Sequence, residues 1–521
     1  MGMTPEDKHP RPQRCHNVSR IWYSVISVSR WSLPYVELNA GQIFTLASYL
    51  VVLLVCIIKD APLISNPNRA GFLALAQLPI VFLFATKNSL FSLLLGPGNG
   101  YEKLNFLHRM AGRLMFLAAG IHGSLWIRNH LEFSLPILGP QKETSGVASF
   151  SLLCAIVLSS LRPVRRLFYG MFFFVHVLTF VAFFVTVCYH TMYASPWIFP
   201  PLAFYGADML MRMLRYRIKD ATLVAQDKFL TTIRVNDCDD GWSAGQHVQL
   251  RVFFSGRMLE SHPLTILSAL PSYSCLTNPG LILGARVNGD WTRALNDFAR
   301  KEQERLHAQD KDAKSTAAVP VHVMLDGPYG GPSVDLGEFE SALLVAGGSG
   351  ITFTLGLLDD IVGRCVKLGR RGGERTRRIE FSWCIRSFGH IQWFSPMLMD
   401  IANVAEGSSI DLRISIFVTC LCDPDAIPPI PNCVVILQRP SIYNLLCELI
   451  APSSSSSVES VEDQGEKMER SEWVCRGGSV AVCASGPESL TAEAQNAVAR
   501  LGVVRGLELG GVAVHVERFA L

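Results

Sequence analysis

Charged residues are scarce in this chain, and neither sign of charge dominates. Only 17% of its 521 residues are Asp, Glu, Lys or Arg, whereas 49% are hydrophobic, and the formal net charge is +3. Because nucleic-acid-binding proteins carry a strongly basic surface, this balance predicts no nucleic-acid partner. A mean hydropathy of +0.27 is also too apolar for an ordinary soluble enzyme of this length.

Paired cysteines and an export signal are missing as well. Fourteen cysteines are scattered without a Cys-x-x-Cys pair, and Cys420 with Cys422 forms only an isolated Cys-x-Cys. This pattern indicates neither a zinc site nor a disulfide framework. Residues 1–40 are polar and lack a signal-peptide pattern. We therefore expect a cytoplasmic N-terminal segment that leads into an uncleaved membrane anchor.

Long apolar stretches, in contrast, are abundant between residues 41 and 211. About 20 apolar residues suffice to cross the bilayer core, and six candidate segments can be counted, the fourth and sixth of them short: 42–58, 71–95, 104–127, 147–161, 170–192 and 196–211. The loops on one side of these segments contain thirteen Lys and Arg residues, and the loops on the other side contain four. The basic side is predicted to be cytoplasmic. Both the N-terminus and the region after residue 219 would then lie there.

Four histidines in the third and fifth segments form two pairs of identical spacing. His108 and His122 are 14 residues apart, as are His176 and His190. At about 100° per residue, such a step returns to within about 40° of the same helix face and rises about 21 Å. Two helices that run in the same direction would offer two imidazole pairs at two membrane depths. A single histidine would more often be a packing residue, but the repeated spacing predicts two stacked bis-histidine haems.

Short strands separated by Gly and Pro turns begin near residue 221. The candidate strands lie within 221–235, 247–254, 377–385, 409–418, 433–438 and 479–487. Helical stretches alternate with the later strands, which predicts a doubly wound parallel sheet. Three segments are expected to be peripheral. Residues 299–318 form a charged and partly helical insertion, residues 369–378 form a basic loop, and residues 452–470 form a low-complexity stretch predicted to be disordered.

A glycine-rich turn follows an apolar strand in the segment Ala342–Val362. Gly347, Gly348, Ser349 and Gly350 lead from this strand into a predicted helix. Glycines at such a turn let the backbone approach a pyrophosphate, and the helix N-terminus favours its negative charge. The G-x-G-x-x-G spacing is not met, because Phe353 stands at the position of the last glycine. The turn could therefore also be a simple strand-to-helix corner.

Several motifs, taken in order, resemble one known superfamily. They are NFLHRMAGRLMFLAAGIHG with the second histidine pair, HPLTI at 262–266, DGPYG at 326–330 and AGGSGIT at 346–352. Together these motifs are similar to those of ferric reductases and NADPH oxidases over about residues 70–521. The chain looks most like the fungal-type ferric-chelate reductases. Both gaps within the histidine pairs are 13 residues in that group, as here, whereas the second gap is usually one shorter in the NADPH oxidases.

The resemblance implies three domains after the N-terminal segment 1–40. A multi-pass α-helical membrane haem domain would occupy 41–219. A module similar to ferredoxin–NADP reductase would follow, with a β-barrel FAD domain at 220–335 and a doubly wound α/β NADPH domain at 336–521 that contains the insertion 452–470. The implied cofactors are two haem b groups, FAD and NADPH.

By motif match, the resemblance also implies site residues. The FAD-binding residues would be His262, Pro263, Leu264, Thr265, Arg286, Gly289 and Thr292. The contact between flavin and nicotinamide would involve Gly327, Pro328, Tyr329 and Phe519. NADPH would be bound by Gly347, Gly348, Ser349, Gly350, Ile351, Thr352, Arg386, Ser485, Gly486 and Pro487. Arg386 matches a position that reads the 2′-phosphate, so NADPH is favoured over NADH.

Three positions depart from the pattern of the superfamily. Ser485 stands where a cysteine is usual, with Cys483 two residues earlier. Phe353 stands where proline is common after the glycine turn, and Asp290 replaces a common glycine near the FAD diphosphate. Ser485 puts the efficiency of hydride transfer in question more than the binding of the cofactors, whereas Asp290 adds a negative charge near the expected phosphates.

The resemblance implies a transmembrane oxidoreductase. Electrons would pass from cytoplasmic NADPH through FAD and the two haems to a ferric or cupric chelate on the far side, with membrane lipid and iron-uptake proteins as partners. The plasma membrane is the expected location, with both termini in the cytoplasm. Two alternatives remain open: an NADPH oxidase that produces superoxide, and a non-catalytic membrane scaffold with a decayed dehydrogenase half.

Overall fold

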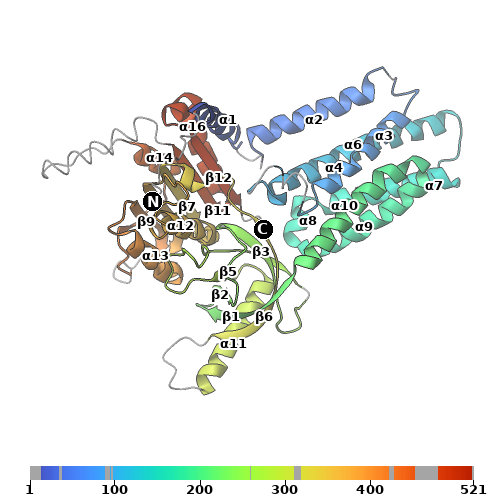
Figure 1. Ribbon diagram of the computed structural model, residues 1–521. Coiled ribbons are helices and arrows are strands. Elements are labelled where there is room, and N and C mark those ends of the chain that lie inside the picture. The colour runs from blue at the N-terminus through green and yellow to red at the C-terminus, as the bar shows by residue number, and fades with distance from the viewer. Residues whose placement is uncertain are drawn as a thin grey trace, which may run out of the picture. The chain divides into compact units, whose positions relative to one another are not determined.

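The computed structural model separates the chain into two compact units (Figure 1). It describes residues 13–33, 38–60, 62–88, 94, 98–258, 260–309, 318–421, 428–451 and 479–518. One unit, the membrane unit, takes in residues 42–215, and the other, the dehydrogenase unit, takes in the described residues on both sides of it. The insertion 452–470 and Phe519 lie outside the described residues.

The membrane unit consists of helices, as predicted. They are α2 (Ala40–Ile58), α3 (Asn68–Ala76), α4 (Leu78–Leu83), α6 (Tyr101–Glu132), α7 (Gln141–Ser159), α8 (Arg162–Leu167), α9 (Tyr169–His190) and α10 (Ser195–Arg215), with a short 3₁₀ turn η1 (Met192–Ala194). Ala70, Ala111 and Ala118 are fully buried, and such small side chains let membrane helices approach closely.

Three of the six apolar segments form helices that are long and apolar enough to cross a bilayer, namely α2, α6 and α9. The second segment differs from the expectation, because it divides into α3 and α4 and its helix ends at Leu83. α7 begins with the polar residues 141–145, and α10 contains Pro200 and Pro201. Proline within a helix removes a backbone donor and favours a bend.

The first part of the dehydrogenase unit is an antiparallel barrel of six strands. Its members are β1 (Arg217–Ala225), β2 (Leu230–Val235), β3 (Gln246–Val252), β4 (His262–Thr265), β5 (Leu281–Arg286) and β6 (Val319–Gly330), in the order β4-β3-β6-β1-β2-β5. A bridge between Ile266 and Leu283 joins the two ends of this sheet and nearly closes it. Alternate residues Val248, Leu250 and Val252 are buried, as expected for strands with one face on the core.

Helix α11 (Asp290–Gln309) covers this barrel core with one face. Trp291, Leu295 and Ala299 are buried among the barrel residues. The charged insertion predicted from residue 299 is therefore helical as far as 309, and the first part of that helix is packed rather than peripheral. Spacings of three and four residues place these apolar side chains on one helix face.

The second part is a parallel sheet with helices between its strands, as the doubly wound prediction required. The strands are β7 (Ser341–Gly347), β8 (Arg378–Ser387), β9 (Asp411–Leu421), β10 (Cys433–Ile436), β11 (Val480–Gly486) and β12 (Val512–Arg518), in the order β10-β9-β8-β7-β11-β12. The helices are α12 (Ile351–Val366), α13 (Ile391–Ala405), α14 (Ile442–Ile450) and α16 (Glu488–Glu508). Short 3₁₀ turns are η2 (Leu336–Glu338), η3 (Gly348–Gly350) and η4 (Phe388–His390).

The strand order reverses between β7 and β11. Every residue of both strands is buried, as expected for central parallel strands covered on two faces. Their carboxyl ends carry Gly347 and Gly486. Open α/β sheets bind ligands at such a switch point, so the fold places the glycine-rich turn at the expected edge.

Helix α1 (Gln13–Ser29) was not foreseen from the sequence. It packs against α16 and β12 and belongs to the dehydrogenase unit. The hydroxyl of Ser27 donates to the carbonyl oxygen of Val512 at 2.6 Å, and the backbone N–H of Ser32 donates to Asn496 at 2.8 Å. Because β12 is the last strand of the sheet, α1 covers an edge that would otherwise be open to pairing.

Candidate haem and nucleotide sites

The structure brings the two predicted histidine pairs together. Helix α6 carries His108 and His122, and α9 carries His176 and His190. The ring centroids of His108 and His176 are 6.2 Å apart, and those of His122 and His190 are 6.1 Å apart. A separation of about 6 Å is what two imidazoles adopt when a nitrogen of each lies about 2 Å from one shared metal ion.

Backbone carbonyl groups hold three of these rings by Nδ1. The Nδ1 atom of His108 lies 2.8 Å from the Val81 oxygen, that of His122 lies 2.9 Å from the Pro67 oxygen, and that of His190 lies 2.7 Å from the Lys142 oxygen. A carbonyl can only accept, so Nδ1 carries the proton and Nε2 keeps its lone pair for a metal. Nδ1 of His176 is buried with no partner among the described residues.

Glycines that the sequence did not single out make room for the second pair. A β-carbon on Gly71 would lie 2.9 Å from the ring of His122, and one on Gly146 would lie 2.8 Å from the ring of His190. Gly112 and Gly123, which follow His108 and His122 along α6, have no atom within 4 Å of an added β-carbon. The donor set and this open space fit a haem between the members of each pair.

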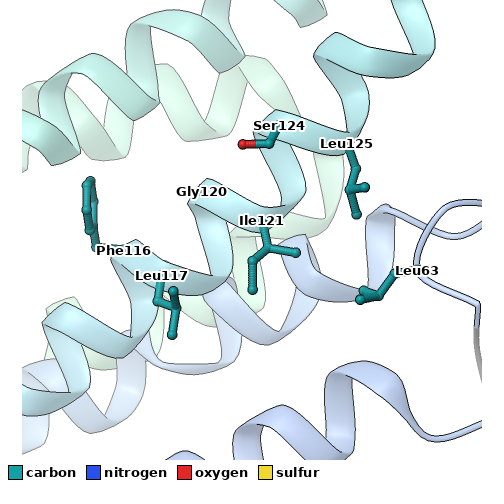
Figure 2. Close-up of a pocket in the computed structure, with 7 residues that line it drawn as sticks. All are labelled: Leu63, Phe116, Leu117, Gly120, Ile121, Ser124 and Leu125. Carbon is teal, nitrogen blue, oxygen red and sulfur yellow. The ribbon is translucent and has the colours of Figure 1, made fainter.

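A shallow apolar hollow on α6 is separate from the histidine pairs. Figure 2 shows Leu117, Ile121 and Leu125 on one side of the helix, toward Leu63, and Ser124 is the one polar side chain among the lining residues. The residues that line the hollow include no titratable side chain.

In the barrel, the HPLT motif forms strand β4. The ring of His262 stacks on Trp291 with a centroid distance of 4.2 Å, and its Nε2 lies 3.6 Å from Glu260. Burial lowers the pKa of His262, while Glu260 opposes this shift. Leu264 is buried, whereas Pro263 is exposed and Thr265 half-buried. The motif thus leaves part of its surface exposed and packs Leu264 into the barrel core.

The predicted diphosphate segment surrounds the start of α11. The hydroxyl oxygen of Thr292 accepts hydrogen bonds at 3.0 Å from the backbone N–H groups of Asn288 and Gly289, so Thr292 shapes this turn. A β-carbon on Gly289 would meet nothing within 4 Å. Arg286, at the end of β5, reaches the glycine turn, since its guanidinium lies 3.1 Å from the β-carbon position of Gly348. Arg286 therefore lies between the predicted FAD and NADPH segments.

The DGPYG motif forms a local hydrogen bond between two of its own residues at the end of β6. The hydroxyl of Tyr329 donates a short hydrogen bond to Asp326. Gly327 has a φ of +126°, and a β-carbon there would lie 3.0 Å from the Tyr329 ring, so only glycine fits this position. The Gly327–Pro328 peptide bond is cis.

The two segments predicted to bind NADPH lie about 135 residues apart in the sequence and pack closely through their glycines. A β-carbon on Gly350 would lie 2.1 Å from the carbonyl oxygen of Ser485, and one on Gly347 would lie 2.7 Å from Pro487. Gly486 has a φ of +149° and approaches the backbone of Gly347. The Ser485 hydroxyl is buried and has no hydrogen-bond partner among the described residues. The structure thus brings together the turn and the segment Ser485–Pro487.

Basic side chains flank this turn. Arg386 follows the buried part of β8, and burial together with the charge of Arg386 lowers the pKa of Arg286. His390 stacks on Trp393 at 4.2 Å, and burial and Arg286 lower its pKa. Positively charged side chains beside a glycine-rich turn at a helix N-terminus favour the binding of a ligand that carries phosphate groups.

The structure explains one departure from the superfamily pattern. Phe353 is fully buried in α12 and stacks on His515 of β12, with a centroid distance of 5.4 Å. It also fills the space beside Gly245, where a β-carbon would lie 2.8 Å from its ring. Phe353 therefore joins the barrel to the sheet as a packing residue. Local sequence could not predict this role, because Gly245 and His515 lie far from Phe353 along the chain.

Comparison with known families divides the chain in the same way. Residues 70–187 match the ferric reductase like transmembrane component, residues 213–333 match an FAD-binding domain, and residues 339–427 match the ferric reductase NAD binding domain. The chain belongs to the ferric reductase superfamily. A membrane domain of this superfamily followed by FAD-binding and NAD-binding domains confirms the predicted domain order.

Curated relatives include both ferric reductases and an oxidase. Ferric reductase transmembrane component 3 of Saccharomyces cerevisiae is 25% identical over 65% of this chain and 45% of its own length. Ferric reductase transmembrane component 1 of Schizosaccharomyces pombe is 26% identical over 67% of this chain and 64% of its own length. A superoxide-generating NADPH oxidase heavy chain of Dictyostelium discoideum is 28% identical over 58% of this chain and 44% of its own length. The chain spans less than two thirds of each of these relatives.

Two solved structures match the chain with low TM-scores. A ferredoxin NADP+ reductase from Neisseria gonorrhoeae with bound FAD and NADP covers 58% of this chain and 98% of its own, with 15% identity and a TM-score of 0.34. A flavohemoglobin from Malassezia yamatoensis covers 88% of this chain and 97% of its own, with 12% identity and a TM-score of 0.38.

Proposed function

We propose that this ferric reductase superfamily member transfers electrons from NADPH through FAD and two haem b groups to a ferric or cupric chelate on the other side of the membrane. The observation that carries the proposal is the pair of histidine sites, with ring separations of 6.2 and 6.1 Å on two apolar helices. When bound, FAD links the two-electron chemistry of nicotinamide to the one-electron chemistry of haem iron.

The residues of each site have a defined task in this proposal. His108 with His176, and His122 with His190, would each hold one haem, and these two haems would carry single electrons. Carbonyl groups bonded to Nδ1 orient three of the rings. The glycine turn would receive the pyrophosphate of NADPH, and Arg386 would pair with its 2′-phosphate. Along the chain the sites occur in the reverse order of the proposed electron path, with the haem domain first and the NADPH segments last.

Both termini are proposed to face the cytoplasm, with the plasma membrane as the location. Two observations support the shared side. The loops on that side contain thirteen of the seventeen Lys and Arg residues counted, and α1 packs in the same unit as the strands that follow the membrane domain. NADPH would then be used in the cytoplasm, and proteins that take up reduced iron would be partners on the other face.

Reduction of a ferric chelate by intact cells tests the proposal. Cells expressing the wild type should reduce extracellular Fe(III)-citrate, detected with a membrane-impermeant Fe(II) chelator, and His122→Ala should reduce this rate at least tenfold. His130→Ala is the matched control, because His130 is on the same helix and bonds the Pro136 oxygen at 3.1 Å but belongs to neither histidine pair. Equal rates for wild type and His122→Ala would refute the proposed path.

Production of superoxide is the second candidate function, and the Dictyostelium relative favours it. It would use the same cofactors and differ only in the acceptor. Superoxide release that is unaffected by added ferric chelate would establish it for this chain. The scaffold alternative is disfavoured by the interlocked glycines at the NADPH segments, and NADPH-dependent flavin reduction by the purified protein would exclude it.

A further inference from the structure

Helix α1 packs on the sheet through a mixed face, within the residues 21–29 whose burial is described. Ser24 is 2% exposed and faces Gly506, Ser27 is 3% exposed and bonds Val512, and the ring of Tyr23 packs on Phe339 at a centroid distance of 5.5 Å. Other large apolar residues point outward, with Ile21 51%, Trp22 63% and Val25 48% exposed. The exposed Trp and Ile side chains of α1 are therefore not covered by the described part of the chain, which is typical of a surface that contacts another partner.

The neighbouring surface continues this apolar character. On α16, which packs against α1, Val504 is 74% and Leu507 38% exposed, and Trp31, just after α1, is 44% exposed. We call these six residues the N-terminal apolar face: Ile21, Trp22, Val25, Trp31, Val504 and Leu507. An exposed apolar surface of this kind is typical of a site that binds a protein or a membrane.

The chain itself keeps this face near a membrane. Ser29 is the last residue of α1 and Ala40 the first residue of α2, a helix apolar enough to span a bilayer. The ten residues between them can extend about 33 Å at most. Residues 13–36 include Arg14 and Arg20 and no Asp or Glu, which complements an anionic leaflet. Arg30 is not part of this surface charge, because burial lowers its pKa. Tryptophan is enriched at the level of lipid headgroups.

We propose that the N-terminal apolar face rests in the headgroup layer of an anionic membrane surface. Trp22 and Trp31 would lie at the boundary between headgroups and acyl chains, and the positive charge of the N-terminal segment would favour anionic lipids. Because the serine side of α1 is bonded to β12 and packed on α16, the helix would attach the nucleotide-binding sheet to the bilayer. This docking does not depend on the haems or on the electron acceptor.

Quenching by brominated lipids tests the docking in the full-length protein. A fluorescent amino acid would replace Trp22 in protein held in lipid nanodiscs of phosphatidylcholine with about 30% phosphatidylserine, an anionic surface, with bromine on the acyl chains. We expect quenching at least threefold stronger than for the same label at Glu304, an exposed position of α11. Quenching equal to that at Glu304 would overturn the proposal, and so would shielding of the label by a second copy or another protein.

A second measurement separates docking from misfolding. Ile21→Ser combined with Val25→Ser should at least halve quenching of a label placed at Trp31, while the FAD content of the purified protein stays at the wild-type level. Nanodiscs of phosphatidylcholine alone should also reduce the quenching at position 22. Quenching that is unchanged by the serine variant, or equal in the two lipid compositions, would contradict an apolar contact with an anionic surface.

Discussion

The backbone of Gly350 approaches Ser485 so closely that a β-carbon on Gly350 would lie 2.1 Å from the Ser485 carbonyl oxygen. The contact joins the start of α12 to the end of β11, at the point where the strand order of the parallel sheet reverses. Backbone atoms cannot move aside as a flexible side chain can. The position therefore requires glycine for close approach, whatever ligand the turn receives.

Replacement of Gly350 tests this contact. Gly350→Ala should displace the turn and weaken NADPH binding at least tenfold, about 1.4 kcal/mol, with FAD retained, as measured by NADPH titration of flavin reduction in the purified protein. Gly206→Ala is the control, because a β-carbon there meets nothing within 4 Å. An unchanged affinity of the Gly350→Ala variant for NADPH would contradict the close contact between Gly350 and Ser485.

The glycines beside the second histidine pair lead to another prediction. Gly146→Ala places a methyl group 2.8 Å from the His190 ring, and Gly71→Ala places one 2.9 Å from the His122 ring. Each variant should push an imidazole off the iron axis and lower the haem content by about half, if one of two haems is lost. Reduced-minus-oxidised absorption spectra measure this. Gly120→Ala, with its nearest atom at 3.9 Å, should retain the wild-type spectrum.

Phe353 should contribute strongly to the stability of the dehydrogenase unit. Phe353→Ala removes a fully buried ring between Gly245 and His515, and such truncations cost about 3–5 kcal/mol. Thermal release of FAD from the full-length protein would report the loss. Phe229→Ala, at a position 44% exposed, should change stability by less than about 0.5 kcal/mol. Similar effects for the two variants would argue against a structural role for Phe353.

Acid should weaken the flavin site through His262. Burial lowers the pKa of His262 in the folded protein, whereas the unfolded chain binds a proton with a pKa of about 6.5. Below a pH of about 6.5 the unfolded state therefore takes up more protons, and stability is lost as the pH falls toward the folded pKa. Retention of FAD between about pH 7.5 and 5, a range that spans this titration, should decline less steeply in His262→Gln than in the wild type. Parallel pH curves would assign the acid sensitivity to other groups.

Much of the architecture could be predicted from local sequence patterns. Hydrophobic runs and a repeated spacing of 14 residues located the helices that carry His108, His122, His176 and His190, because helical periodicity alone decides which residues share a face. Alternating and continuous apolar runs likewise located β1, β2 and β3 of the barrel and β7 to β11 of the parallel sheet. The strands β5, β6 and β12 and the helix α1 were not recognised.

Tertiary structure decided which distant residues meet. Gly71 and Gly146 lie beside His122 and His190 only after α3, α6, α7 and α9 have packed, and no spacing in the chain encodes that approach. The same holds for Gly350 with Ser485. Local periodicity selects a helix or strand and its buried face, but close contacts between segments a hundred residues apart depend on how those faces interdigitate at crystal-like density. Sequence alone therefore determined the elements and the candidate ligands, and packing determined the geometry that makes them sites.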